Sequence, residues 1–289
     1  MYRHPEICAV IVTYYPDLRL LNKNVSTILQ QVGGVVIVNN TPEPLCVSER
    51  NGGVKVIEIG QNLGLGAAQN IGMEYAFSRK FEFVVQFDQD TLPTVDYIAN
   101  IFGSFKDLED NGFCVGLVGA NVTDIKTGKP IKSKSNPSLL LGRYEVIDEV
   151  LSSGSLIPKK TFLRVGKIDE SLFIDLVDFE YCWRIRAEGL LVVRPLSARI
   201  YHDLGDGTFE IFGYRLFGIP SPFRHYYQFR NTMVLVLSRR ATLLWSAKNL
   251  FKLLFKLLFY PILLDRGLQR CGFMLKGLAH SFKRRGGPL

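Results

Sequence analysis

Short apolar runs alternate with amphipathic stretches along the first third of the chain. Residues 7–13, 35–38 and 54–59 are continuous apolar runs rich in β-branched side chains, the pattern of strands covered on both faces. Residues 18–31 carry apolar side chains at helical spacing, and a glycine-rich run at 61–72 opens a helix that extends to about residue 78. This alternation predicts a parallel α/β sheet with helices on both faces.

The middle of the chain continues the alternation less regularly. The pattern predicts a helix over residues 95–110, a strand over 113–119 and a long polar loop over 124–144, of a length that often serves as a lid. Ligands of parallel sheets gather at the carboxyl ends of the strands, so Thr13 and Asn39 are expected on one functional rim. Further short elements are expected at residues 152–157, 160–165, 173–186, 191–193 and 198–202.

The C-terminal part of the chain has a different character. Residues 241–264 are strongly apolar, yet Lys248, Lys252 and Lys256 recur at helical spacing and fall on one stripe of a predicted helix. These charges and Pro261 argue against a membrane-spanning segment. The pattern favours an amphipathic helix lying in the membrane interface and attracted to anionic lipid, with a helix packed on the body and its lysines in water as the alternative.

Charge is distributed as unevenly as hydropathy. The whole chain carries a formal charge of +8, and residues 239–289 contain eleven lysines and arginines against the single acid Asp265, a net of +10, which leaves the first 238 residues at −2. The basic extension therefore points to an anionic partner. Five scattered cysteines and an N-terminus without a signal-peptide pattern favour a reducing cytoplasm.

Two aspartates end the most informative run of the sequence, residues 81–91. The apolar part of this run predicts a buried strand, so Asp88 and Asp90 should project to one side while Gln89 points away. Paired carboxylates suit Mg²⁺ or Mn²⁺, which complete their coordination with water and substrate phosphates. The alternative is a strand that simply ends in a turn, where aspartate is common.

Two other segments carry candidate chemistry. In the glycine-rich run, Gly64 permits close backbone approach at a helix start, which favours a phosphate, and a helix start without a ligand is the alternative. The glycine spacing does not fit a dinucleotide motif, so a nicotinamide site is rejected. Farther along, Asp175, Asp178 and Glu180 open a predicted amphipathic helix and are more acids than helix capping requires.

Six motifs in order make the sequence resemble the family 2 glycosyltransferases with the GT-A fold, most closely the bacterial rhamnosyltransferase branch. The resemblance implies a mixed, mostly parallel sheet flanked by helices. It also implies a catalytic domain over residues 1–210 and a C-terminal helical extension over 211–289 on the membrane and acceptor side. The motifs occupy residues 9–16, 36–40, 62–70, 87–90, 173–180 and 201–202.

The resemblance also implies roles for individual residues. Asn39 stands where the family has aspartate, which leaves an amide oxygen to accept from a pyrimidine N–H. By the same resemblance, Asp178 matches the catalytic base, and Asp175 and Glu180 orient the acceptor or support the site. The metal that bridges the diphosphate would be held by Asp88, Asp90 and His202. The nucleotide sugar would be bound by Thr13, Tyr14, Asn39, Asn62, Gly64, Asn70 and Asp88.

Together these observations predict an inverting, metal-dependent glycosyltransferase. A sugar hydroxyl is a poor nucleophile, so a carboxylate must take its proton, and a cation stabilises the departing nucleoside diphosphate. The resemblance favours L-rhamnose from dTDP-rhamnose over UDP-sugars. The expected acceptor is a growing lipid-linked polysaccharide at the inner face of the cell membrane, and no nucleic-acid partner is expected.

Two interpretations from other classes stay open at this point. The run at residues 87–91 also resembles the nucleophile motif of haloacid-dehalogenase-type phosphatases, with Asp88 as nucleophile, but there the motif ends the first strand of the fold. A non-enzymatic basic membrane-binding module would explain the extension but not the acidic clusters. Release of free nucleoside diphosphate from a nucleotide sugar would separate all three hypotheses.

Overall fold

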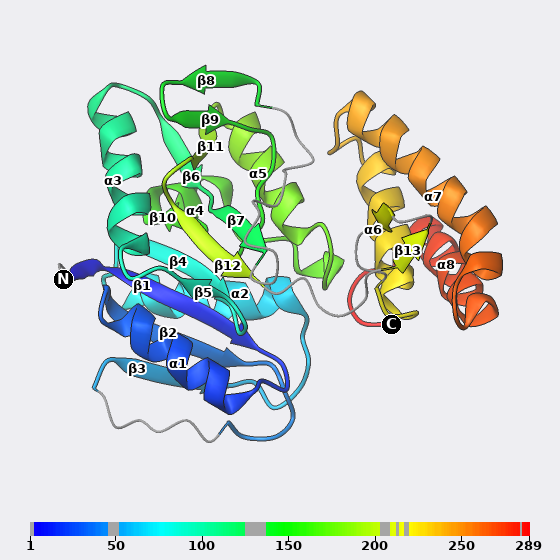
Figure 1. The fold of residues 1–289 in the computed structure, drawn as a ribbon, viewed down its shortest axis with the longest axis horizontal. Coiled ribbons are helices and arrows are strands. Elements are labelled where there is room, and N and C mark those ends of the chain that lie inside the picture. Colours follow the sequence, from blue (N-terminus) through cyan, green and yellow to red (C-terminus); the bar gives the residue numbers. More distant parts are fainter. Residues whose placement is uncertain are drawn as a thin grey trace.

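A mixed sheet of nine strands is the centre of the protein, which we describe from a computed structural model (Figure 1). Residues 3–45, 52–124, 137–202, 209–211, 214–216, 220–283 and 285–289 are described. In spatial order the strands are β3 (Val54–Glu58), β2 (Val32–Asn39), β1 (His4–Thr13), β4 (Phe83–Asp88), β10 (Leu156–Pro158), β6 (Val115–Val118), β11 (Leu191–Pro195), β9 (Tyr144–Val146) and β8 (Leu139–Leu141).

Parallel pairing dominates one half of this sheet. Strands β3, β2, β1 and β4 are parallel, and β6 is parallel to β11. Between these two groups β10 runs antiparallel to both neighbours, and β8 and β9 form an antiparallel hairpin at the far edge. The mixed, mostly parallel GT-A-type sheet expected from the sequence is therefore confirmed.

Helices cover both faces of the sheet, as the alternating pattern predicted. On one face lie α1 (Leu18–Leu29) and α3 (Tyr97–Asp110), and on the other lie α2 (Leu65–Ser78), α4 (Lys159–Val165) and α5 (Val177–Ala187). Strand β1 shows the two-residue period directly, because Ile7, Ala9 and Ile11 enter one core while Cys8 and Val10 enter the other. The first strands and helices predicted from the sequence are thus confirmed.

The polar stretch at residues 124–144 is not one continuous loop, and in this the sequence prediction was wrong. Residues 125–136 lie outside the described part of the chain, but β8 and β9 form within the rest. Tyr144 and Val146 are buried, and β9 pairs with β11, so the hairpin extends the sheet edge. The hairpin was missed because polar residues surround its few buried side chains, so the sequence shows no apolar run there.

Two smaller sheets complete the body. Strands β5 (Leu92–Pro93), β12 (Arg199–His202) and β7 (Asn121–Asp124) form the first, with β12 antiparallel to β5 and parallel to β7. Strands β13 (Phe209–Ile211) and β14 (Tyr214–Leu216) form a hairpin that precedes the C-terminal helices. A 3-10 turn, Glu170–Leu172, leads into the segment before α5.

Three C-terminal helices stand beside the body: α6 (Arg224–Leu237), α7 (Leu243–Leu263) and α8 (Gly267–Phe282) (Figure 1). Helix α8 lies close against α6, where a Cβ atom on Gly277 would come within 2.5 Å of the Tyr226 carbonyl oxygen. Helix α7 confirms the prediction for residues 241–264 and contains Pro261 in its last turn. Among the described residues, no helix is long and apolar enough to cross a membrane.

Candidate active site

A cleft of about 990 Å³ lies between the body and the C-terminal helices. One wall is formed by the carboxyl ends of β1, β2 and β4 together with the start of α5, and the other wall by α6 and α7. This location agrees with the rule that ligands of α/β sheets bind beyond the carboxyl ends of the strands. Of the residues predicted as site residues, the cleft is lined by Tyr14, Asn62, Gly64, Asp88, Asp90, Asp175 and Asp178.

Asp88 and Asp90 both face the cleft, but not because they alternate along one strand. Strand β4 ends at Asp88, whose backbone N–H donates to Ser153 Oγ at 3.1 Å, and Asp90 lies in the turn that follows. Gln89 also lines the cleft, where its Oε1 accepts from the Tyr14 N–H at 2.7 Å. The prediction that Gln89 points away was wrong, because the strand had already ended.

These carboxylates fit a hard divalent cation by the chemistry of their oxygen donors. Within the described part of the chain, no group of three or more His, Cys, Asp or Glu is arranged to hold a metal ion. His202, the third ligand implied by the resemblance, ends β12, and its side chain lies outside the described residues. Asp88 and Asp90 are therefore the described candidates for holding a cation.

Thr13 and Asn39 lie beneath the rim rather than on it. Both are fully buried, and Asn39 Oδ1 accepts from Thr13 Oγ1 at 3.3 Å and from Thr41 Oγ1 at 2.7 Å. The amide oxygen expected to meet a pyrimidine N–H is thus already in use inside the protein. The next residue, Asn40, lines the cleft and donates from Nδ2 to Asn62 Oδ1 at 3.0 Å. Sequence reasoning missed it, although the Asn-Asn pair was the available signal.

The glycine-rich start of α2 packs against the segment that precedes α5. Gly64 has a φ of 89°, and a Cβ atom there would lie 2.5 Å from Phe173 Cδ2, so both backbone angle and space require glycine. The Leu65 N–H donates to the Phe173 carbonyl oxygen at 2.6 Å. Asn70 is buried and exchanges hydrogen bonds of 2.9 Å with the backbone of Ile168. This segment is therefore held closely against α2.

Asp178 combines a position in the cleft with an altered acidity. It is half-buried in the first turn of α5, where its Oδ1 accepts from the Phe179 N–H at 3.0 Å. Loss of hydration raises the pKa of the Asp178 carboxyl to about 7, and the nearby charges of Asp175 and Asp88 act in the same direction. A carboxylate of that pKa can accept a proton near neutral pH.

The backbone just before Asp178 is strained. Phe173, Asp175 and Leu176 have φ values of 65°, 64° and 67°, in a region of backbone conformation that residues other than glycine rarely adopt. Helix α6 holds this segment: Asn231 Nδ2 donates to the carbonyl oxygens of Ile174 and Asp175, and Arg230 Nη2 donates to that of Leu172, just before it. Sequence reasoning missed both residues, because the stretch around them mixes polar, aromatic and aliphatic residues without a distinctive pattern.

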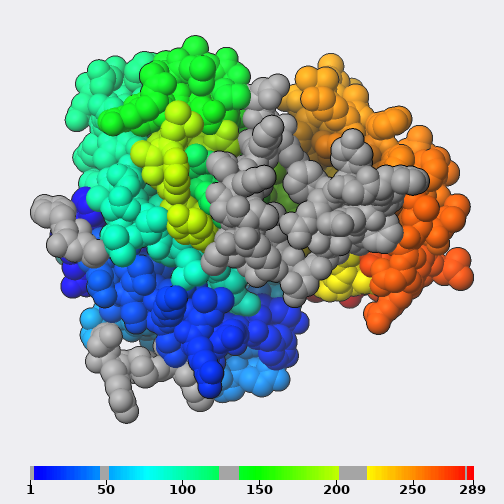
Figure 2. Space-filling model, viewed as in Figure 1, coloured from blue at the N-terminus to red at the C-terminus, as the bar shows by residue number. Residues whose placement is uncertain are grey.

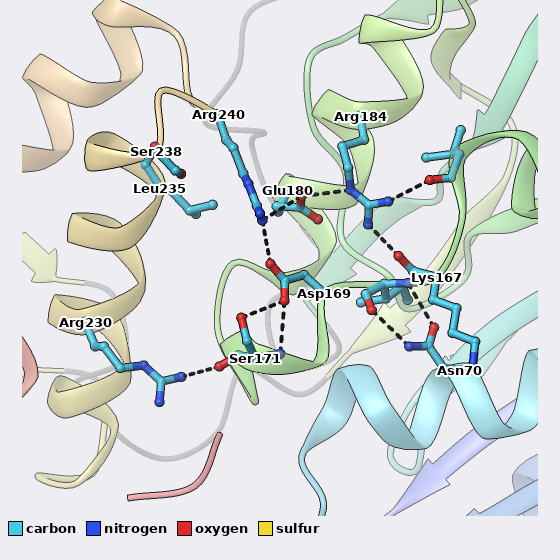
Figure 3. A network of polar contacts seen from close by, with 12 residues as sticks. Asn70, Lys167, Asp169, Ser171, Glu180, Arg184, Arg230, Leu235, Ser238 and Arg240 are labelled. Carbon is cyan, nitrogen blue, oxygen red and sulfur yellow. Dashed lines mark hydrogen bonds and ion pairs between the residues drawn. The ribbon is translucent and has the colours of Figure 1, made fainter. Parts of the chain in front are cut away.

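The other two acids of this cluster are paired with cations. Asp175 Oδ1 lies 2.5 Å from Arg224 Nη2 at the start of α6. Glu180 is buried away from the cleft, 2.8 Å from Arg184 Nε and 3.3 Å from Arg240 Nη1, in the network that joins α5 to the end of α6 (Figure 3). Glu180 therefore does not line the cleft, and its carboxylate pairs with two arginines instead.

The lysine stripe of α7 faces the cleft. Lys248, Lys252 and Lys256 line it, and Trp245 of the same helix meets Trp183 of α5 edge to face, with ring centroids 4.9 Å apart. The lysines that line the cleft are not all fully in water, because Lys248 and Lys252 are exposed while Lys256 is half-buried. The helix also exposes a row of large apolar side chains, among them Phe251, Leu254 and Leu258.

Comparison with known proteins identifies the class. The sequence profile of Glycosyl transferase family 2 matches residues 9–164. The dTDP-rhamnosyl transferase RfbF of Shigella flexneri is 32% identical over 255 residues, which are 84% of each chain. In fold, the chain is similar to S. aureus TarS 1-349 in complex with UDP-GlcNAc, with a TM-score of 0.59, 14% identity, and coverage of 96% of this chain and 81% of that one.

A second solved structure extends the likeness in fold. GalNAc-T7 with UDP, GalNAc and Mn²⁺ has a TM-score of 0.57 and 16% identity, and the match covers 75% of this chain but only 45% of that one. The fold is of the GT-A type, and the family profile identifies the chain as a glycosyltransferase. The chain belongs to glycosyl transferase family 2 and is similar to its bacterial rhamnosyltransferases.

Proposed function

We propose that this protein transfers L-rhamnose from dTDP-rhamnose to a lipid-linked glycan, with inversion at the anomeric carbon. The donor is supported by the 32% identity to a protein named as a dTDP-rhamnosyl transferase. The observation that carries the mechanism is the presence of Asp178, whose pKa is raised to about 7, in the same cleft as Asp88 and Asp90. A proton acceptor and a pair of cation ligands thus share one space.

The nucleotide part of the donor would lie along the strand ends. Asn40, Asn62 and Gly64 line this part of the cleft, and the Asn40 side chain holds the turn at Asn62 by accepting from the Leu63 N–H at 2.9 Å. These contacts fix the shape of the rim before any ligand arrives. Preformed polar groups reduce the entropy lost on binding.

Asp88 and Asp90 would hold the divalent cation of the donor. When bound, such a cation supplies charge stabilisation to the departing nucleoside diphosphate. The two carboxylates come from the end of β4 and the turn after it, next to the Tyr14 backbone that Gln89 contacts. Mn²⁺ in the GalNAc-T7 structure supports a cation in this fold.

Asp178 would act as the general base. It takes the proton from the attacking hydroxyl of the acceptor while that oxygen forms the new bond to the anomeric carbon and the bond to the diphosphate breaks. Attack from the side opposite the leaving group inverts the anomeric centre. The strained segment at residues 173–176 fixes the start of α5 and thereby the direction of the Asp178 carboxylate.

The C-terminal helices would bring the enzyme to the inner face of the membrane, where a lipid-linked acceptor resides. Helix α7 exposes Phe251, Leu254, Phe255, Leu258 and Ile262, a continuous apolar surface on a strongly basic part of the chain. Such a surface next to positive charge suits the interface of an anionic bilayer.

The family assignment excludes the phosphatase and the purely non-enzymatic alternatives, and a donor screen tests the rest. Purified protein would be heated with a panel of nucleotide sugars, with and without Mn²⁺. We expect dTDP-rhamnose with Mn²⁺ to raise the unfolding temperature most. We also expect the protein to release dTDP slowly from dTDP-rhamnose on prolonged incubation. If a UDP-sugar raises the unfolding temperature most, the proposed donor is wrong. If dTDP-rhamnose raises the unfolding temperature equally in EDTA, the proposal that a cation helps to bind the donor is wrong.

A further inference from the structure

Lys248, Lys252 and Lys256 form a row along the α7 wall of the cleft, which we call the lysine row. They are four residues apart, and a helical rise of about 1.5 Å per residue spreads the row over roughly 12 Å. Lys248 and Lys252 are exposed, and Lys256 is half-buried with its Nζ 2.7 Å from Gln228 Oε1. The row is thus a strip of positive charge on a rigid element.

The wall opposite the lysine row is acidic. Asp88, Asp90 and Asp178 line it. A phosphate entering this cleft is repelled unless cations compensate its charge. The donor diphosphate would have the divalent cation held by the aspartates. A second phosphate would need positive charge of its own, and the α7 wall provides it.

The remaining surface of α7 suggests what kind of molecule carries that second phosphate. The exposed apolar surface runs beside the lysine row on the same helix, with Phe251 70% and Ile262 81% exposed. Helix α7 lies at the upper right of the molecule, in orange (Figure 2). Positive charge facing the cleft and hydrocarbon facing outward together match a ligand with a phosphate head and an apolar tail.

We propose that the lysine row binds the phosphate or diphosphate group of a lipid-linked acceptor, whose tail leaves the cleft along the apolar surface of α7. The inference rests on the proposed function and adds a recognition site to it. It places the anionic end of the acceptor on the C-terminal helices and the sugar end toward Asp178. The Trp183–Trp245 contact, at a centroid distance of 4.9 Å, joins α5 to α7, the two helices that carry these ends.

A binding experiment tests the site without knowledge of the acceptor sugar. Farnesyl diphosphate is titrated by calorimetry into full-length protein saturated with dTDP and Mn²⁺, with farnesol as the neutral control. We expect farnesyl diphosphate to bind without displacing dTDP, more weakly at high salt. The double variant Lys248→Gln/Lys252→Gln should weaken this binding by about tenfold per lysine, because each removes one charge-assisted contact.

Matched variants separate a specific site from general charge. Lys276→Gln/Lys283→Gln removes the same charge from exposed positions on and just after α8, outside the lining of the cleft, and should bind as wild type does. Lys248→Arg/Lys252→Arg should retain most of the affinity. An unfolding temperature close to wild type for all three variants verifies that they fold.

Three outcomes would overturn the proposal. If farnesyl diphosphate displaces dTDP, and Asp88→Asn weakens the binding of farnesyl diphosphate and of dTDP equally, the lysine row is part of the donor site. If the Lys248→Gln/Lys252→Gln variant binds farnesyl diphosphate normally but loses affinity for anionic vesicles, the row binds lipid headgroups. If the α8 variant loses as much affinity as the α7 variant, the effect is one of net charge. Failure of dTDP to bind wild type would instead count against the proposed function.

Discussion

The side-chain nitrogen of Asn231 lies 2.7 Å from the carbonyl oxygen of Ile174. It also lies 2.9 Å from the carbonyl oxygens of Leu172 and Asp175, so one side chain of α6 donates to three backbone carbonyl groups in and beside the strained segment. Each residue held in the left-handed region costs on the order of 1–3 kcal/mol unless the surroundings impose it. The segment before Asp178 is thus held by a C-terminal helix, and the two parts of the chain line one cleft.

Asn231→Ala tests this dependence. The change leaves buried carbonyl groups without a donor, so we expect the free energy of unfolding to fall by about 1–3 kcal/mol. Because the loop would no longer direct Asp178, kcat should fall by about tenfold or more while donor affinity stays within about twofold. Asn22→Ala, at an exposed position of α1, is the control and should change neither quantity. An equal loss of donor affinity would assign the loop to the donor instead.

Asp178→Asn should lower kcat by about 100-fold or more and leave the binding of donor and cation close to wild type, because the base touches only the acceptor hydroxyl. Asp175→Asn should be milder, since Asp175 is engaged by Arg224 at 2.5 Å. Steady-state kinetics with donor titrations would check both. A dead Asp175→Asn beside an active Asp178→Asn would transfer the role of base to Asp175.

The acidity of Asp178 predicts a pH dependence. Its pKa is raised to about 7 by loss of hydration, so the base is protonated and inactive below that pH. We expect kcat/KM to fall with unit slope on the acid side, with a midpoint no higher than about 7, because a cation at Asp88 stabilises the carboxylate. A flat profile between pH 5 and about 8 would contradict the assignment.

Stability should respond to the same group with the opposite trend. Because the folded pKa of Asp178 lies above its ordinary value of 3.8, the folded state binds the proton more tightly, and stability falls as pH rises from about 4 to about 7. The Asp178→Asn variant has no carboxyl to ionise at this position, so it does not lose stability in this pH range. It should be more stable than wild type above pH 7, by up to about 4 kcal/mol. Denaturant unfolding at pH 4 and at pH 8 would reveal the difference.

Asp88→Asn or Asp90→Asn should abolish transfer by removing an oxygen ligand of the cation, with the fold intact. EDTA should inhibit wild type to the same extent, and Mn²⁺ should restore it. Calorimetric titration of Mn²⁺ in the presence of dTDP would measure the lost affinity directly. Full activity in EDTA would count decisively against a cation in this enzyme.

Membrane attachment is better tested by point variants than by removing the extension, because α8 packs on α6 and α6 holds the segment before Asp178. Leu254→Gln/Leu258→Gln on the exposed surface of α7 should weaken binding to anionic vesicles several-fold, since it removes apolar contact area. Leu139→Gln/Leu140→Gln, on the exposed β8 hairpin, is the matched control. Unchanged vesicle binding in the α7 variant would refute attachment through this surface.

Most of the fold could be predicted because its signals are local. The apolar runs of β1, β2 and β4 reflect burial on both faces, and the lysines of α7 repeat at helical spacing. The β8–β9 hairpin could not be predicted, because its burial depends on pairing with β11, a strand about 45 residues farther along the chain.

The candidate site was partly predictable for a related reason. Asp88 and Asp178 were found because each belongs to a compact local motif, and the structure places both in one cleft. The burial of Asn39 beneath Asn40 and the role of Asn231 were not found. Both depend on where a side chain meets backbone or side chains from other elements, which no local pattern encodes.

The opposed walls of the cleft have a consequence for the product. If the acceptor is held by its phosphate at the lysine row, the distance from that row to Asp178 selects acceptors by length. This distance is fixed because the lysine row and Asp178 lie on rigid helices, α7 and α5. An acceptor of one length then brings its terminal hydroxyl to the base. After transfer, the new terminal sugar reaches past the base, and the chain is too long to serve again. Such an enzyme adds one sugar at one step of an assembly and leaves further growth to others.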